Sequence, residues 1–152
     1  RDLTRWKVRL GVYSRAYADY ESYYQEFNVS SVLVNPNFDP VTFANDIALI
    51  WLDEKVNIND GVSPICVTRD MYTVGESCVV TGWGTTSVGG ETMDKLQEVY
   101  KPILSQDQCL SDYPNLGFDK VSMLCAGYSA GGHDACLVCP FRSSIPFPLS
   151  TM

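Results

Sequence analysis

The sequence predicts an all-β protein with one short helix, built as a barrel or a sandwich of short strands. Three observations support this fold class. Apolar and polar residues alternate in several short segments, and turns that contain Gly or Pro separate these segments. No apolar run approaches the roughly 20 residues that a membrane-spanning helix needs. Only one segment has a clear helix-start signal.

The first part of the chain carries three predicted strands. Residues 6–10 alternate between apolar and basic side chains, which is typical of a half-buried strand. A second strand is expected over 27–34. The continuous apolar run 47–52 is short enough for a strand buried on both faces. Residues 13–24 contain five Tyr, and we expect a Tyr-rich surface loop there, with a helix as the alternative because four of the Tyr have helical spacing.

The second part of the chain adds three more strands and the helix. Strands are expected from Cys78 onward, over 96–103 and over 121–128. Pro102 places the 96–103 strand at a sheet edge or a bulge, because proline cannot donate to a ladder. Ser105 and Gln108 have the spacing of a capping box, which predicts a short helix near 105–112.

Composition excludes several classes of protein. The chain has 152 residues, of which 45% are hydrophobic and 19% charged, so it is not intrinsically disordered. Its net charge of −7 argues against a general nucleic-acid binder, which needs a basic surface. It has a single histidine, His133, so any histidine-dependent chemistry must use that residue or a histidine from elsewhere.

Six cysteines favour an oxidising compartment, and we expect a secreted protein, with cytosolic thiols as an alternative. Asn28-Val29-Ser30 is an N-glycosylation sequon, which makes Asn28 a glycosylation candidate. A zinc-binding domain is an alternative, since four possible ligands have the spacing C-x7-H-x2-C-x2-C: Cys125, His133, Cys136 and Cys139.

Several segments resemble, in the same order, the trypsin-like serine endopeptidases of the chymotrypsin fold. The segments are residues 6–11, Asn35-Pro36-Asn37-Phe38, Asn45-Asp46-Ile47-Ala48-Leu49-Ile50, 64–67, Val80-Thr81-Gly82-Trp83-Gly84, Cys125-Ala126-Gly127-Tyr128 and 131–136. The resemblance implies two antiparallel β-barrels with the active site between them. Such domains have roughly 200–250 residues, so we expect this chain to hold the middle part of one, truncated at both ends.

The resemblance also implies a division of the chain. Residues 1–60 are expected to be the remainder of the first barrel, and 61–77 the connection between barrels. Residues 78–136 are then the first part of the second barrel. The resemblance stops at Cys136, and we expect 137–152 to be an unmatched, disordered tail. A splice event or a frameshift is one hypothesis for this abrupt end.

Asp46 is the candidate catalytic residue. It matches the family's Asp-Ile-Ala-Leu motif, in which the carboxylate accepts the N–H of the catalytic histidine and holds its tautomer. The histidine itself is expected upstream of residue 1, because His133 follows Asp46. At the family's nucleophile position stands Pro140, which has neither a hydroxyl nor a backbone N–H. The sequence therefore predicts that this chain alone is inactive.

Asp134 is the candidate specificity residue. By resemblance, an Asp at this position lies at the base of the primary pocket and pairs with Arg or Lys of a polypeptide substrate. The function implied is endopeptidase cleavage after basic residues. The alternative is a non-catalytic, protease-like binding module or a truncated splice product.

The family pattern pairs Cys109 with Cys125. It leaves four cysteines without a partner in this chain, of which Cys66 resembles the one that binds a propeptide: Cys66, Cys78, Cys136 and Cys139. No metal or cofactor is expected. Calcium, bound by some members in the loop matching 12–26, is disfavoured because Val12 stands where those members often have Glu, and Asp19, Glu21 and Glu26 are off the pattern. No membrane or nucleic-acid partner is expected.

Overall fold

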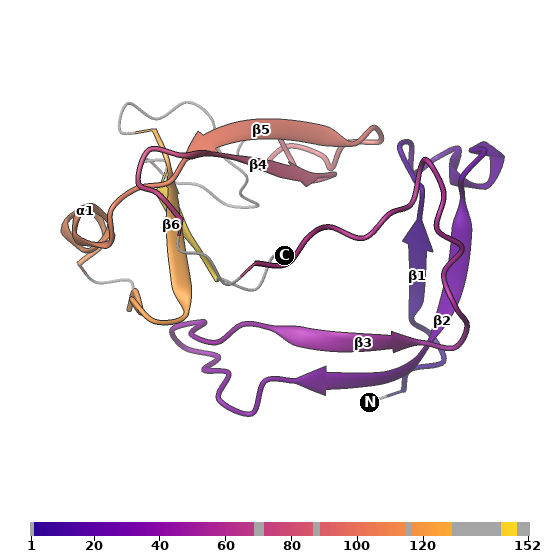
Figure 1. Cartoon of the computed structure of the whole chain (residues 1–152), viewed down its shortest axis with the longest axis horizontal. Coiled ribbons are helices and arrows are strands. Elements are labelled where there is room, and N and C mark those ends of the chain that lie inside the picture. Colours follow the sequence, from indigo (N-terminus) through magenta and orange to yellow (C-terminus); the bar gives the residue numbers. More distant parts are fainter. Residues whose placement is uncertain (1, 69–71, 87–88, 115–116, 129–143, 149–152) are drawn as a thin grey trace.

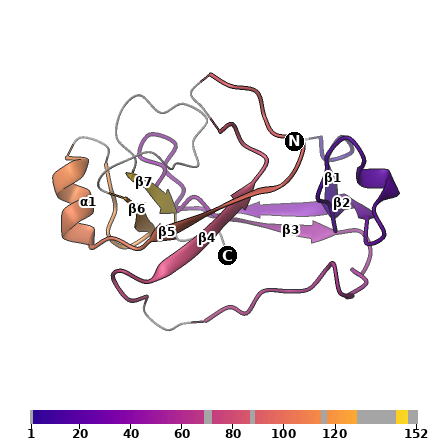
Figure 2. The same ribbon diagram turned by 90° about the horizontal axis from the view of Figure 1, so that it is seen from above.

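The structure is a computed structural model that describes residues 2–68, 72–86, 89–114, 117–128 and the backbone of 144–148. It contains seven strands, one α-helix and one 3₁₀ turn within these residues, which confirms the all-β class with one short helix. Helix α1 and strand β1 lie at opposite ends of the molecule (Figures 1 and 2). Among the described residues, none of the helices has the length and apolar character needed to cross a bilayer.

The first part of the chain folds into a three-stranded antiparallel sheet. Strand β1 (Lys7–Leu10) pairs with the first half of β2 (Gln25–Val34), and β3 (Ala48–Leu52) pairs with the second half. The register of β2 against β3 shifts between Val29 and Ser31. Between β1 and β2 lies the predicted surface loop, with one 3₁₀ turn, η1 (Ala18–Tyr20), in place of the alternative helix.

The second part contains two smaller sheets. Strand β4 (Ser77–Gly82) pairs with β5 (Gln97–Pro102), so Pro102 ends a strand at a sheet edge, as predicted. Strand β6 (Met123–Gly127) pairs with β7 (Ser144–Pro148). All of these pairings are antiparallel.

Helix α1 (Gln106–Asp112) begins at the predicted cap. The Ser105 hydroxyl accepts the Gln108 N–H at 3.1 Å, which satisfies one of the helix's unpaired donors. The Gln108 side chain binds Asp112 instead of returning to the cap. The helix carries Cys109 into a small core formed with Phe118, Met123 and Cys125, against which four further side chains pack: Ala44, Leu104, Leu110 and Tyr113.

Strand β7 lies within residues 137–152, for which a disordered tail was expected, and that division of the chain stays a prediction. Residues 144–148 pair with β6 in register from Met123↔Pro148 to Gly127↔Ser144. Pro146 and Pro148 are two residues apart, so their missing N–H positions point to the same side of the strand. An edge strand tolerates proline on the side that faces away from its partner, which is why this proline-containing segment can still form a ladder.

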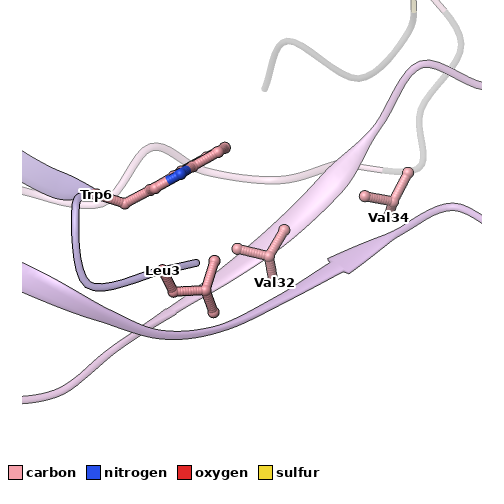
Figure 3. Close-up of a pocket in the computed structure, with 4 residues that line it drawn as sticks. All are labelled: Leu3, Trp6, Val32 and Val34. Atoms are coloured by element: carbon pink, nitrogen blue, oxygen red, sulfur yellow. The ribbon is translucent and has the colours of Figure 1, made fainter. Parts of the chain in front are cut away.

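The apolar run of β3 suggested a strand buried on both faces, but the structure shows that it is not buried in this way. It is the outer strand of its sheet, and Leu49, Ile50 and Trp51 are about half exposed. Periodicity indicates how apolar a strand is, whereas its burial depends on what packs against it. Beside β3, an apolar pocket of about 270 Å³ opens between the N-terminal segment and β2; it is lined by Leu3, Trp6, Val32 and Val34 (Figure 3).

Asp94 joins the first part of the chain to the second. Its carboxylate accepts hydrogen bonds from the Ser14 hydroxyl at 2.8 Å and from the Ala16 N–H at 2.7 Å. The Trp83 indole N–H also donates to the Tyr13 carbonyl at 3.1 Å. A second cavity, of about 600 Å³, has residues of both parts in its lining: Arg9, Val12, Arg15, Ala16, Ala18, Trp83, Thr92, Met93 and Asp94.

Candidate functional site

Asp46 stands two residues before β3, at the end of the loop that connects β2 with β3. The side chain is exposed. A hydrogen bond joins the two ends of this loop, since the Asn35 N–H donates to the Ile47 carbonyl at 2.9 Å. The sheet therefore fixes both ends of the loop that carries the candidate carboxylate.

Asp39 organises the interior of this loop. Its carboxylate accepts the Val41 N–H at 2.9 Å and the Thr42 hydroxyl at 2.7 Å. Its backbone bonds reach forward to Phe43 and Ala44. Aspartate favours such turns because its short side chain can bind backbone donors two residues later. Asp39 thus builds the turns of the loop that leads to Asp46.

Two of the three residues that precede Asp46 adopt a left-handed backbone. Phe43 has φ 60° and Asn45 has φ 57°. Asparagine accepts this region more readily than other residues with a side chain. The Asn45 amide also donates to the Asn37 carbonyl at 3.3 Å. Asn45 therefore fits the sharp reversal that presents Asp46.

The loop is tied to the second part of the chain through Ser122. The Asn45 N–H donates to the Ser122 hydroxyl oxygen at 3.0 Å, across 77 positions of sequence. The Ser122 hydroxyl in turn donates to the Asp119 carboxylate. Ala44 packs on the core around Cys109 and Cys125. The turn before Asp46 therefore rests on the segment that enters β6.

Asn45→Ala is expected to lower the free energy of unfolding by about 1 kcal/mol, because alanine tolerates the left-handed backbone poorly and the amide contact is lost. Urea denaturation of the purified chain measures this change. Asn37→Ala is the matched control, since the exposed Asn37 contributes a backbone carbonyl that alanine retains. Equal losses in the two variants would contradict the role given to Asn45.

Three carboxylates that hold these loops have lowered pKa values. Hydrogen bonds from Thr42 and the Val41 N–H lower the pKa of Asp39, and those from the Ala16 N–H and Ser14 lower the pKa of Asp94. The Ser122 hydroxyl and the Val121 N–H lower the pKa of Asp119. Each charged carboxylate is therefore bound more favourably in the folded chain than in the unfolded one.

The melting temperature of the chain is expected to fall as the pH drops below about 4, the ordinary pKa of aspartate. The unfolded chain then binds more protons than the folded chain, so the stabilisation present above that pH is lost through the lowered folded-state pKa values. Asp94→Asn should lower the melting temperature at neutral pH. It should also reduce the further fall in melting temperature as the pH drops. Parallel acid profiles for the variant and the parent would refute the assignment to Asp94.

The structure describes Asp46 but not the other candidates near the end of the chain. Asp134, His133, Cys136, Cys139 and Pro140 lie outside the described residues. The sequence made Asp46 a candidate, which stays a prediction, and it did not single out four residues that hold the loops of the first part: Asp39, Asp94, Asp119 and Ser122. The turn residues 35–40 gave a local signal for Asp39, whereas no local signal marked Ser122.

Comparison with known proteins identifies the family. The trypsin family model matches residues 2–137. The chain is 41% identical to trypsin-1 of Astacus astacus over 114 residues, which are 74% of this chain and 47% of that protein. It is 34% identical to trypsin of Sus scrofa over 134 residues, 88% of this chain and 56% of that protein.

The chain belongs to the trypsin family. It is also 36% identical over 138 residues to serine proteinase stubble of Drosophila melanogaster, covering 88% of this chain and 18% of that larger protein. The chain spans about half the length of the two trypsins that it matches. The match includes the turn that carries Asp46, so this trypsin-like serine protease domain contains the candidate carboxylate.

The disulfide expected for a trypsin family member is present. Cys109 and Cys125 are bonded, with their Cα atoms 6.1 Å apart. Cys66 is exposed and Cys78 half-buried, and both are free thiols within the described residues. Burial, with a contribution from the Glu76 charge, raises the pKa of the Cys78 thiol.

The zinc alternative loses one of its four ligands, because Cys125 is oxidised in the disulfide. Within the described parts of the chain, no three His, Cys, Asp or Glu side chains gather as a metal site would require. In the loop that trypsins sometimes use for calcium, the Glu21 carboxylate instead accepts the backbone N–H groups of Tyr13 and Ser14, at 2.8 and 2.6 Å.

Asn28 lies on β2, and its side chain is exposed. Its amide oxygen accepts from the Lys7 ammonium, and its amide nitrogen donates to the Asp53 carboxylate, both at 2.5 Å. The sequon thus sits in a regular strand that pairs with β1. Glycosylation of Asn28 stays a prediction.

Proposed function

We propose that this chain is the central part of the catalytic domain of a trypsin-like serine endopeptidase. Asp46 is its triad carboxylate and Asp134 the carboxylate of its primary specificity pocket. The observation that carries this proposal is the Asp46-Ile47-Ala48-Leu49 motif at the start of β3, inside the family match, on a turn tied to Ser122. A carboxylate held on so constrained a turn can orient a partner side chain.

In this proposal the Asp46 carboxylate accepts the Nδ1–H of a histidine. It thereby fixes the imidazole tautomer that removes the proton from the serine nucleophile, and it stabilises the imidazolium that forms. The single histidine of these 152 residues, His133, follows Asp46 rather than preceding it, and Pro140 stands at the nucleophile position. We therefore propose that the 152-residue chain hydrolyses no peptide bond by itself.

The proposed substrates are extracellular polypeptides cleaved after Arg or Lys. A carboxylate at position 134 would pair with the substrate cation by charge-assisted hydrogen bonds. The disulfide between Cys109 and Cys125 fits an oxidising compartment and hence secretion. The exposed thiol of Cys66 is accessible to a propeptide cysteine.

A fluorophosphonate probe tests the proposed inactivity. The probe reacts covalently with an activated serine, and in this proposal the chain lacks the triad histidine that activates one. We expect no labelling of the folded 152-residue chain in a reaction that labels pig trypsin to completion. Stoichiometric labelling of the chain would show that it contains an activated nucleophile and would end this part of the proposal.

One observation favours a second candidate, a non-catalytic protease-like module. Strand β7 lies beyond the end of the family match, yet it pairs with β6 over five residues. A segment that completes a sheet contributes to a folded product. Deleting residues 144–152 should then reduce amide protection in β6, measured by hydrogen exchange, and unchanged protection would remove the support for this candidate.

A further inference from the structure

The loop between β1 and β2 holds five tyrosines in very different settings. Tyr20 has 87% of its surface exposed, against 66% for Tyr17, 53% for Tyr13 and 44% for Tyr23. The Tyr24 hydroxyl donates to the Glu26 carboxylate at 2.9 Å. The Tyr20 hydroxyl has no hydrogen-bond partner among the described residues. Tyr20 is thus the most accessible phenol of the loop.

Tyr20 is also the tyrosine with an acidic residue on each side, Asp19 and Glu21. No Lys or Arg occurs between residues 16 and 54. The nearest cation in the sequence, Arg15, has its guanidinium bound to the Thr92 hydroxyl at 2.9 Å, on another segment. The immediate surroundings of Tyr20 along the chain are therefore negatively charged.

The backbone presents this side chain outward. Tyr20 ends the 3₁₀ turn η1, and the Tyr20 N–H donates to the Tyr17 carbonyl at 3.0 Å. Ala18, which is only 3% exposed, anchors the inner side of the turn. The carboxylate of Glu21 holds the base of the loop through its bonds to the Tyr13 and Ser14 N–H groups. The loop is thus an ordered projection with Tyr20 at its outer surface.

We propose that Tyr20 is a site of tyrosine O-sulfation. An enzyme that transfers sulfate must bind a polyanionic donor, an activated phosphosulfate, and so presents a cationic active site. Such a site attracts a phenol that has a negative charge on each side, within one Debye length. This inference rests on the proposed function only in so far as sulfation requires passage through the secretory pathway.

The reaction balances without any redox change. The Tyr20 phenol oxygen attacks the sulfur of the phosphosulfate, and the S–O bond to the phosphate breaks. The phenol proton passes to a base of the transferase. The products are a tyrosine sulfate monoester and the phosphate part of the donor, which is the leaving group. The loop gains one permanent negative charge, which adds to the net charge of −7.

The test uses the purified, folded 152-residue chain, a tyrosyl sulfotransferase and a ³⁵S-labelled phosphosulfate donor. An acidic tyrosine peptide in a parallel reaction confirms that the enzyme is active. We expect label in the peptide that contains Tyr20. Tyr20→Phe should lose it, and Tyr17→Phe, a matched change in the same turn, should keep it. Asp19→Asn should slow incorporation while the phenol remains.

Absence of label while the control peptide is sulfated would overturn the proposal. So would equal labelling of the parent chain and Tyr20→Phe, since the sulfate would then be on another residue. These outcomes are independent of proteolysis. A chain that is sulfated on Tyr20 and also reacts with a fluorophosphonate would overturn the proposed inactivity and leave the sulfation site intact.

Discussion

Asp46→Asn is expected to lower kcat by about ten-thousand-fold in a chimeric trypsin that contains this chain's central segment. The magnitude is the one known for trypsin's own triad aspartate and is carried over to this relative. Asparagine keeps the size of the side chain but holds the histidine in the wrong tautomer. In the chimera, residues 19–134 of this chain replace the aligned stretch of pig trypsin, which supplies the histidine and the serine.

The segment 19–134 follows from the extent of the match. The alignment with pig trypsin covers 134 of the 152 residues, so 18 residues lie outside it. Wherever these 18 residues are divided between the two ends, residues 19–134 lie within the alignment. Hydrolysis of an arginine ester by the chimera, measured at saturating substrate, gives kcat. Asp53→Asn is the matched control, because Asp53 lies just after β3, at the opposite end from Asp46, and binds Asn28.

A second change in the same chimera separates orientation from specificity. Asp134→Ser should leave the chimera reactive toward a fluorophosphonate, while removing the preference for Arg and Lys in kcat/KM, because the pocket would lack its charge.

One outcome would contradict the role proposed for Asp46. If Asp46→Asn and Asp53→Asn were equally active in the chimera, Asp46 would not be the triad carboxylate. That result would leave the family assignment untouched, since it rests on the sequence match.

Removing the disulfide should lower the free energy of unfolding by about 3 kcal/mol, because in the unfolded chain the bond closes a loop of about 15 residues. Cys109 and Cys125 are 16 positions apart, and both are buried in the core beside Phe118 and Met123. For a domain of this size, that loss corresponds to a melting temperature lower by roughly 6–12 °C. The double variant Cys109→Ala, Cys125→Ala avoids burying a hydroxyl.

Cys66→Ser provides the control for this measurement. Cys66 is exposed and unpaired, so the substitution should change stability by less than about 0.5 kcal/mol. It also removes one thiol that could exchange with the disulfide. Identical melting temperatures for the parent chain and the double alanine variant, under oxidising conditions, would show that the crosslink contributes no stability.

Features coded by neighbouring residues could be predicted from the sequence. The cap of α1 depends on Ser105 and Gln108 alone, and the structure has it where expected. The Asp46 motif is four consecutive residues, so the resemblance located it directly. The tyrosine-rich loop was predicted as a loop, and it contains only a single 3₁₀ turn.

Features that depend on distant residues could not be predicted in this way. The exposure of β3 follows from its position at the sheet edge, which its apolar sequence does not encode. The pairing of β7 with β6 joins residues on either side of the point where the resemblance ends. The partner of Asn45 is Ser122, and no pattern around either residue links the two.

The bond between Asn45 and Ser122 also sets an order of events during synthesis. The two residues are 77 positions apart, and at roughly 5–20 residues per second the ribosome needs roughly 4–15 s to translate that interval. Throughout this time β2 and β3 can pair, but the turn before Asp46 lacks its anchor. The candidate catalytic carboxylate therefore reaches its final setting only after Ser122 has left the ribosome.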